Sequence, residues 1–260
     1  MIYDQHIHTR FSVDSKEEME NYLKLLKDKE MKYFISCDHI DFDLINYHND
    51  WLCDFDARRA EIDRLKKIYP EITFLEGVEL GFRKDHLDDM RGVLKRKFDL
   101  VQLSVHDNGV YDFYKDVKSE EVMNVYFDYI LEAVSTWDDF NTLSHIDYGF
   151  KTYKRFNTNA DINNYEDILN KIFKVLISKG KALEVNTKVQ SAVNDEFFTH
   201  LRDLLKMYKN AGGKKLTLSS DSHTTEFFMV DFEKYVQVIK ESGFDSLSYF
   251  INREEHLYKI

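Results

Sequence analysis

The stretch Asp4-Gln5-His6-Ile7-His8, close to the start of the chain, contains a pair of histidines two residues apart. On an extended backbone such residues point to the same side, so the imidazoles of His6 and His8 project from one face. Two imidazoles placed in this way can supply half of a metal site. A single histidine is more often structural, so the prediction depends on further ligands elsewhere in the sequence.

Candidate ligands recur at the ends of later apolar runs. They are Asp38-His39, Glu79, His106, His145 and Asp221-Ser222-His223. In the last motif, Asp221 and His223 again stand two residues apart. Six segments that carry a histidine or an acidic residue at the same place in their local pattern indicate one shared site.

The apolar runs alternate with amphipathic segments. Seven short runs are predicted as strands, at residues 2–3, 33–37, 72–79, 100–105, 142–144, 181–186 and 215–219. Helical spacing of apolar residues predicts helices at residues 16–29, 56–69, 119–133, 165–178 and 196–210. Six strands carry candidate ligands at their C-terminal ends, which is typical of a parallel β/α barrel with its site at that face. Because an open doubly wound sheet would place ligands at only one or two positions, we predict an α/β TIM-like barrel of seven strands.

The length and charge of the chain narrow the choice of partner. A chain of 260 residues suits one domain of barrel size, residues 1–260. The formal net charge of −11 disfavours long nucleic acid and an anionic membrane surface. No uncharged run approaches the length of a membrane span. A small phosphorylated substrate remains compatible with this charge if the pocket contains metal ions, and the oligomeric state is undetermined.

The two cysteines, Cys37 and Cys53, are too few and too irregularly placed for a disulfide framework or a thiolate metal site. Such cysteine usage is typical of a reducing compartment. The residues that precede His6 leave no room for a leader peptide. We therefore predict a cytoplasmic protein.

The candidate ligands offer nitrogen and oxygen but no sulfur. They are His6, His8, Asp14, His39, Glu79, His106, His145, Asp221 and His223. This set suits Zn, Mn or Fe and is too large for one ion, so two or three divalent ions are predicted. Clustered divalent ions lower the pKa of bound water and stabilise both ends of an in-line displacement, which indicates hydrolysis of a phosphate ester.

Some of these positions have a second interpretation. Asp14 precedes Ser15, whose spacing to Glu18 is that of a helix-capping box, so Asp14 could belong to the cap instead. Asp38 could face away from the site and support it from behind. Glu76 and Glu79 lie on opposite faces of an ideal strand, and Glu79, at the strand end, is the better candidate. The remaining histidines are predicted to lie on the surface: His48, His86, His200 and His256.

The order of these motifs resembles the PHP (polymerase and histidinol phosphatase) domain family. The resemblance rests on His6-Ile-His-Thr-Arg-Phe-Ser-Val-Asp-Ser15, Asp38-His-Ile-Asp-Phe42, Gly77-Val-Glu-Leu-Gly81 and Ser219-Ser-Asp-Ser-His223. These motifs are similar to those of the stand-alone histidinol-phosphate phosphatases and cover essentially the whole chain. The resemblance implies a distorted seven-stranded barrel, the PHP fold, with a trinuclear metal site.

Carried over by position, the resemblance also implies how the ligands are divided. It implies one ion held by His6, His8, Glu79 and Asp221, a second by Glu79, His106 and His145, and a third by Asp14, His39 and His223. Asp221 and His223 are accordingly predicted to be part of the catalytic machinery.

The chain departs from the family pattern after Glu184-Val-Asn-Thr187. Enzymes of this type often carry an arginine shortly after this motif, whereas here Lys188-Val-Gln-Ser191 follows. Lys188, Arg155 or both are therefore predicted to hold the phosphate, although lysine cannot replace the two-pronged guanidinium of arginine. Lys154 and Arg155 could instead be solvated loop charges, or the substrate could be another phosphomonoester.

The metal ligands predict a phosphomonoester hydrolase, and the resemblance implies that it releases phosphate from L-histidinol phosphate in histidine biosynthesis. One alternative within the same family is a nucleotide phosphatase or nuclease. An alternative of another class is a non-catalytic sensor of metal or phosphate. The sequence does not assign the general acid for the leaving alkoxide.

Overall fold

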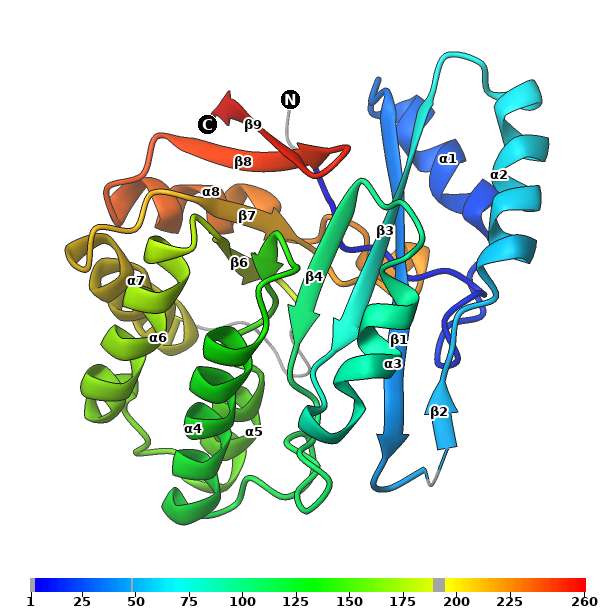
Figure 1. Cartoon of the computed structure of the whole chain (residues 1–260). Helices are drawn as coiled ribbons and strands as arrows, with labels where there is room; N and C mark the ends of the chain where they lie inside the picture. The colour runs from blue at the N-terminus through cyan, green and yellow to red at the C-terminus, as the bar shows by residue number, and fades with distance from the viewer. Residues whose placement is uncertain (1–2, 48, 189–194) are drawn as a thin grey trace.

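The computed structural model describes residues 3–47, 49–188 and 195–260, and its core is a seven-stranded sheet surrounded by helices (Figure 1). The sheet runs in the order β2-β1-β3-β4-β5-β6-β7. Its strands are β1 (Tyr33–Leu44), β2 (Asn49–Trp51), β3 (Thr73–Gly81), β4 (Leu100–Ser104), β5 (Thr142–Leu143), β6 (Ala182–Asn186) and β7 (Leu216–Ser219). All neighbouring pairs are parallel except β1 with β2, so the carboxyl ends of six strands share one edge.

The N-terminal segment lies between β7 and β1 at this edge. Ile7 forms a parallel bridge with Ser222, and the backbone N–H of His8 donates to the Ser222 carbonyl at 2.9 Å. On the other side, the Ile7 carbonyl accepts from the backbone N–H of Cys37 at 2.8 Å. The chain around Ile7 thus connects the two ends of the parallel ladder, as the predicted barrel of seven segments requires.

The first predicted strand was misplaced. Met1 and Ile2 lie outside the described residues, and Tyr3 is not in a strand. Its ring instead stacks on Tyr249, with the ring centroids 4.1 Å apart. The segment first pairs with the sheet at Ile7, which stands between His6 and His8.

Eight α-helices are present among the described residues. They are α1 (Met19–Asp28), α2 (Phe55–Ile68), α3 (Leu87–Val93), α4 (Glu120–Thr136), α5 (Tyr148–Phe156), α6 (Glu166–Ser178), α7 (Asp195–Asn210) and α8 (Phe232–Glu241). The five predicted helices are confirmed, but α1 begins at Met19 with Glu18 as its N-cap, so the predicted capping box of Ser15 and Glu18 does not form. The Ser15 hydroxyl donates to the His223 carbonyl at 2.9 Å. In Figure 1, α1 and α2 lie beside β1 and β3, while α4 to α7 cover the other part of the sheet. Within the described residues, no helix is long and apolar enough to cross a membrane.

Sequence analysis missed two elements that matter for the site. Residues 148–156, where Lys154 and Arg155 were considered as loop charges, form α5, which buries Phe150 and Tyr153. The stretch between the predicted strand 33–37 and the predicted helix 56–69 contains β2, which pairs with the end of β1. Both elements are short, and their apolar residues are interspersed with polar ones.

A C-terminal hairpin, β8 (Ser246–Ile251) with β9 (Glu254–Lys259), was also not predicted. Phe250 packs with Ile35, Leu75, Leu100 and Ala182, which lie near the beginnings of four parallel strands. The Gln5 side chain donates to the Phe250 carbonyl at 2.9 Å and accepts from its N–H at 2.7 Å. The hairpin therefore covers the end of the sheet opposite the strand ends that carry the candidate ligands (Figure 1).

Candidate metal centre

The nine predicted ligands come together at the carboxyl ends of the parallel strands. His39 of β1 and Glu79 of β3 are paired directly across the sheet. His106 and His145 each follow a strand end by two residues, at β4 and β5. Asp221 follows the end of β7 by two residues and His223 by four, so the strand geometry alone brings most of the set to one place.

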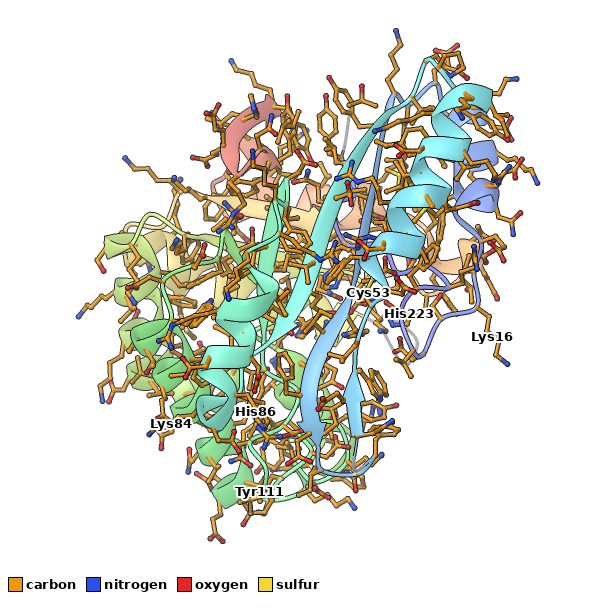
Figure 2. The ribbon with its side chains drawn as sticks, turned by 45° about the vertical axis from the view of Figure 1, so that its right-hand side comes forward. Lys16, Cys53, Lys84, His86, Tyr111 and His223 are labelled. Atoms are coloured by element: carbon orange, nitrogen blue, oxygen red, sulfur yellow. The ribbon has the colours of Figure 1, made fainter. Side chains whose placement is uncertain are left out.

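The other histidines lie elsewhere in the described structure. His86 pairs with Asp89 at 2.8 Å and stacks on Phe42, and in Figure 2 it lies away from His223. His200 packs against Phe150, and His256 stacks on Tyr249. His48 lies outside the described residues. His86, His200 and His256 do not belong to the cluster. Each is partly buried, and so less exposed than the predicted surface position.

Glu79 is at the centre of the cluster and is fully buried. Its Oε2 lies 3.1 Å from His6 Nε2, 3.4 Å from His8 Nε2 and 3.1 Å from His39 Nδ1, and its Oε1 lies 3.3 Å from His106 Nε2 and 2.8 Å from His145 Nε2. Burial raises the pKa of this carboxyl, but the surrounding imidazoles, His39 and His6 foremost, outweigh burial and hold the pKa well below its usual range. Glu76 instead faces Arg58 and Arg59 on the other side of the strand, which agrees with the choice of Glu79.

Two further carboxylates border the cluster. Asp221 Oδ1 lies 3.1 Å from His8 Nε2. Asp14 Oδ2 lies 2.9 Å from His223 Nε2 and 3.7 Å from His39 Nε2. Asp14 therefore faces the cluster and not a helix cap.

Three groups among the described residues have ligand atoms that all lie within 4.8 Å of one another. They are His8, Asp14, His39 and His223; His6, His8 and Asp221; and His39, Glu79 and His106. These groups overlap extensively with those that the resemblance implied. The main difference is that His39 takes the place expected for His145, although His145 still contacts Glu79.

The donor atoms have the character expected of a metal site. Among the described residues, the buried atoms His6 Nε2, His8 Nε2, His39 Nδ1 and Glu79 Oε2 have no hydrogen-bond partner. Buried polar atoms without partners are costly, and these four face one another. A divalent cation bound among them would satisfy all four, and nitrogen and oxygen donors without thiolate suit zinc, manganese or iron.

Glu184 of β6 supports the cluster from behind. Its Oε1 accepts a hydrogen bond from His6 Nδ1 at 2.8 Å, and its Oε2 accepts from the backbone N–H of His145 at 2.9 Å. Burial raises the pKa of Glu184, but the neighbouring His6 outweighs burial and lowers it. With the proton on Nδ1, the Nε2 lone pair of His6 faces the cluster, which is how carboxylates orient metal-binding histidines.

Ser12 and Asp41 support two other histidines in the same way. The Ser12 hydroxyl accepts from His8 Nδ1 at 2.9 Å, and Asp41 Oδ1 accepts from His106 Nδ1 at 2.7 Å. Sequence analysis assigned no role to Ser12, Asp41 or Glu184. The one available signal was an acidic residue inside an otherwise apolar strand, as at Glu184.

Asp38 faces away from the cluster and orders the loop after His8. It accepts hydrogen bonds from the backbone N–H of Thr9 at 2.7 Å and from Arg58 at 3.1 Å. Arg58 is fully buried and also donates to the Gly77 carbonyl at 2.9 Å. This buried ion pair connects the N-terminal loop to β1, α2 and β3.

The backbone at Asp221 is left-handed, with φ of 51°. Residues other than glycine rarely adopt this conformation, although aspartate tolerates it better than most. The Asn186 side chain donates to Asp221 Oδ2 at 3.2 Å and holds the carboxylate in place. Such conformations are typical of functional sites.

The two predicted phosphate-binding residues have different surroundings. Lys188 Nζ lies 3.1 Å from Asp221 Oδ1 and 3.2 Å from His223 Nδ1. Lys188 lines a cavity of about 290 Å³ whose walls also include candidate ligands and the rings of Tyr47, Trp51, Tyr114 and Tyr148. Arg155 is exposed on α5, with its guanidinium carbon 5.5 Å from the centre of the Tyr114 ring, and does not line this cavity.

The PHP domain model matches residues 4–188, so the chain belongs to the PHP domain family. Among its relatives, histidinol-phosphatase of Lactococcus lactis subsp. lactis (strain IL1403) is 28% identical and aligns with 95% of this chain and 93% of its own length. A probable histidinol-phosphatase of Clostridium acetobutylicum is 27% identical over 92% of each chain.

The fold is also similar to a solved structure. The crystal structure of histidinol phosphate phosphatase from Lactococcus lactis subsp. lactis Il1403, complexed with zinc, L-histidinol and phosphate, has a TM-score of 0.86 to this chain. The similarity covers 97% of this chain and 98% of that chain, at 25% sequence identity. The predicted family and the predicted PHP fold are confirmed.

Proposed function

We propose that this chain is a metal-dependent phosphomonoesterase that hydrolyses L-histidinol phosphate to L-histidinol and phosphate in histidine biosynthesis. The observation that carries the proposal is the convergence of histidine and carboxylate donors around the buried Glu79, beside a cavity of about 290 Å³. The similarity to a histidinol phosphate phosphatase over nearly the whole of both chains supports it. We also propose that residues 1–260 form one catalytic domain.

The proposed cofactor is a set of two or three divalent ions, with zinc as the first candidate because the similar crystal structure contains zinc. The residues that would hold them are His6, His8, Asp14, His39, Glu79, His106, His145, Asp221 and His223. Such ions, when bound, activate water as a nucleophile and stabilise negative charge on a phosphate group. The imidazoles around Glu79 outweigh its burial and keep the carboxyl ionised, so that it would be available to hold these ions.

Lys188 is the better supported candidate for the phosphate contact. Its ammonium group lies in the cavity beside Asp221 and His223, whereas Arg155 lies behind Tyr114. A lysine presents a compact charge, so it would neutralise a phosphate oxygen without the paired hydrogen bonds of arginine. The aromatic walls of the cavity, including Trp51 and Tyr148, would exclude water and suit a flat organic group.

The decisive experiment compares substrates on protein loaded with zinc or manganese. We expect kcat/KM for L-histidinol phosphate to exceed that for a panel of sugar and nucleoside phosphates, and Glu79→Gln, purified in parallel, to exclude a contaminating phosphatase. A preference for a nucleoside monophosphate would favour the nucleotide phosphatase alternative. Absence of turnover for every substrate, para-nitrophenyl phosphate included, would favour a sensor.

A cytoplasmic location remains a prediction from cysteine usage. Cys37 and Cys53 are both buried and free. Free thiols of this kind are typical of a reducing compartment.

A further inference from the structure

Asp41 is a buried carboxylate at the metal centre that does not belong to the nine candidate ligands. It lies two residues after His39 on β1 and is 2% exposed. Its Oδ1 accepts the hydrogen bond from His106 Nδ1 at 2.7 Å, and its Oδ2 lies 3.1 Å from His39 Nδ1. One carboxylate on β1 thus contacts a candidate ligand on its own strand, His39, and a second, His106, that follows β4.

The hydrogen bond to Asp41 determines which nitrogen of His106 faces the cluster. A carboxylate accepts, so the proton is on Nδ1 and the lone pair is on Nε2. That Nε2 lies 3.3 Å from Glu79 Oε1, on the side where an ion would bind. A hydrogen bond on the distant nitrogen fixes both the tautomer and the ring orientation of a metal-binding histidine.

Gly81 on β3 provides independent evidence that the Asp41 carboxylate has a defined position beside His106. A Cβ atom at Gly81 would overlap the Asp41 carboxylate and lie only 2.7 Å from its Cγ. Gly77, four residues earlier on the same strand, is less constrained: a Cβ there would lie 3.1 Å from its nearest neighbours, Cys37 Sγ and Ile35 Cδ1. The volume that the Asp41 carboxylate fills is therefore available only because residue 81 has no side chain.

We propose that Asp41 is a positioning residue that orients His106 toward the metal ions, and that Gly81 provides the space its carboxylate needs. Asp41 acts through His106 and is not itself a ligand. This inference rests on the proposed metal-dependent function but not on the identity of the substrate, because zinc binding is measured without substrate.

The test measures zinc binding directly in four variants. Competition with a chromogenic chelator gives the zinc affinity, and mass spectrometry of the metal content gives the stoichiometry at saturating zinc. We expect Asp41→Ala and Gly81→Ala to bind zinc about 10- to 100-fold more weakly than wild type while reaching the same stoichiometry. Asp41→Asn, which keeps an acceptor oxygen, should be closer to wild type, and Gly77→Ala should match wild type.

A spectroscopic measurement separates positioning from general destabilisation. In the cobalt-substituted proteins, Asp41→Ala and Gly81→Ala should show the same altered visible absorption, whereas Gly77→Ala should show the wild-type spectrum. Circular dichroism of the zinc-free variants reports on folding separately, and Asp41→Ala decides the question if Gly81→Ala does not fold.

Three results would overturn the inference. Unchanged zinc affinity and an unchanged cobalt spectrum in Asp41→Ala would remove the positioning role. A reduced stoichiometry at saturating zinc in that variant would make Asp41 a ligand instead. A folded Gly81→Ala that binds zinc like Gly77→Ala would refute the packing argument. By contrast, wild-type protein that binds zinc but turns over no phosphomonoester would contradict the proposed function and leave this test intact.

Discussion

His6 Nδ1 lies 2.8 Å from Glu184 Oε1, although the two residues are 178 positions apart in the chain. The other oxygen of the same carboxylate accepts the backbone N–H of His145 at 2.9 Å. Glu184 therefore holds two candidate ligands, one from the N-terminal segment and one from the end of β5. Because both oxygens accept hydrogen bonds, these contacts require Glu184 as an ionised carboxylate.

Glu184→Gln should weaken zinc binding because an amide can accept through only one of its two polar atoms. Either the His6 ring or the His145 backbone then loses its acceptor, and we expect zinc affinity to fall about 10- to 100-fold. Chelator competition measures the change. The control is Glu255→Gln, because Glu255 lies on the terminal hairpin and forms an ion pair with Lys215. Equal zinc affinity in both variants would show that Glu184 does not support the site.

Glu79→Gln should lower metal content and phosphatase activity together. The substitution removes the charge that five imidazole nitrogens surround. Glu76→Gln is the matched control because Glu76 belongs to the same strand but pairs with Arg58 and Arg59 away from the cluster. Metal analysis of the purified proteins and steady-state kinetics provide the two measurements. Similar losses in both variants would mean that the central carboxylate has been assigned to the wrong residue.

Lys188→Ala should reduce kcat/KM for every phosphomonoester, because phosphate is their common part. Loss of a charge-assisted hydrogen bond costs roughly 1.5–3 kcal/mol, which corresponds to about a tenfold to a hundredfold or larger decrease. Arg155→Ala is the control and should remain near wild type, since Arg155 packs over Tyr114 outside the cavity. Metal content must be unchanged in both. A loss of kcat/KM in Arg155→Ala alone would assign the phosphate contact to Arg155. Wild-type kinetics in both variants would mean that the metal ions alone bind the phosphate.

The buried thiol of Cys53 should make stability depend on pH under alkaline conditions. Burial raises its pKa from 9.0 to about 12 in the folded protein. The folded state holds the thiol proton more tightly than the unfolded state, so the contribution to stability is complete below pH 9 and decreases as the pH rises toward 12. Urea unfolding between pH 8 and about 10.5 gives the free energy of unfolding of wild type and of Cys53→Ser. As the pH rises, the free energy of wild type should fall more steeply than that of the variant. A difference independent of pH would contradict the raised pKa.

Both Cys53→Ser and Cys37→Ser should retain full metal content, since the metal groups found among the described residues contain no cysteine.

Sequence by itself was sufficient to predict the class of fold and to select nine candidate donors, which the structure brings to one place. Most of the candidate donors stand at or just after the end of an apolar run, and the carboxyl ends of parallel strands meet at one edge, so the local pattern predicts a shared site. His39 and Glu79 illustrate this: they belong to separate predicted strands and become direct neighbours once β1 and β3 pair. The choice of Glu79 over Glu76 followed from the alternation of side chains along a strand.

Tertiary structure alone decided which residues support and complement these donors. Periodicity describes a residue's own element, whereas the contacts of Gln5 with Phe250 and of His6 with Glu184 join segments 245 and 178 residues apart. For this reason the docking of the C-terminal hairpin on the sheet and the supporting role of Glu184 were not predicted.

The same distinction applies to Asp14 and Lys188. Sequence left Asp14 as either a ligand or a cap companion, and it left the phosphate contact to Lys188, Arg155 or both. Asp14 faces the cluster because the Ser15 hydroxyl donates to the His223 carbonyl and holds this part of the chain beside His223, while α1 begins only at Met19. Lys188 enters the cavity because it follows β6 directly into the ring of strand ends, while α5 carries Arg155 to the outer face of Tyr114. Local composition is the same in either outcome, and only the paths of the two segments through space separate them.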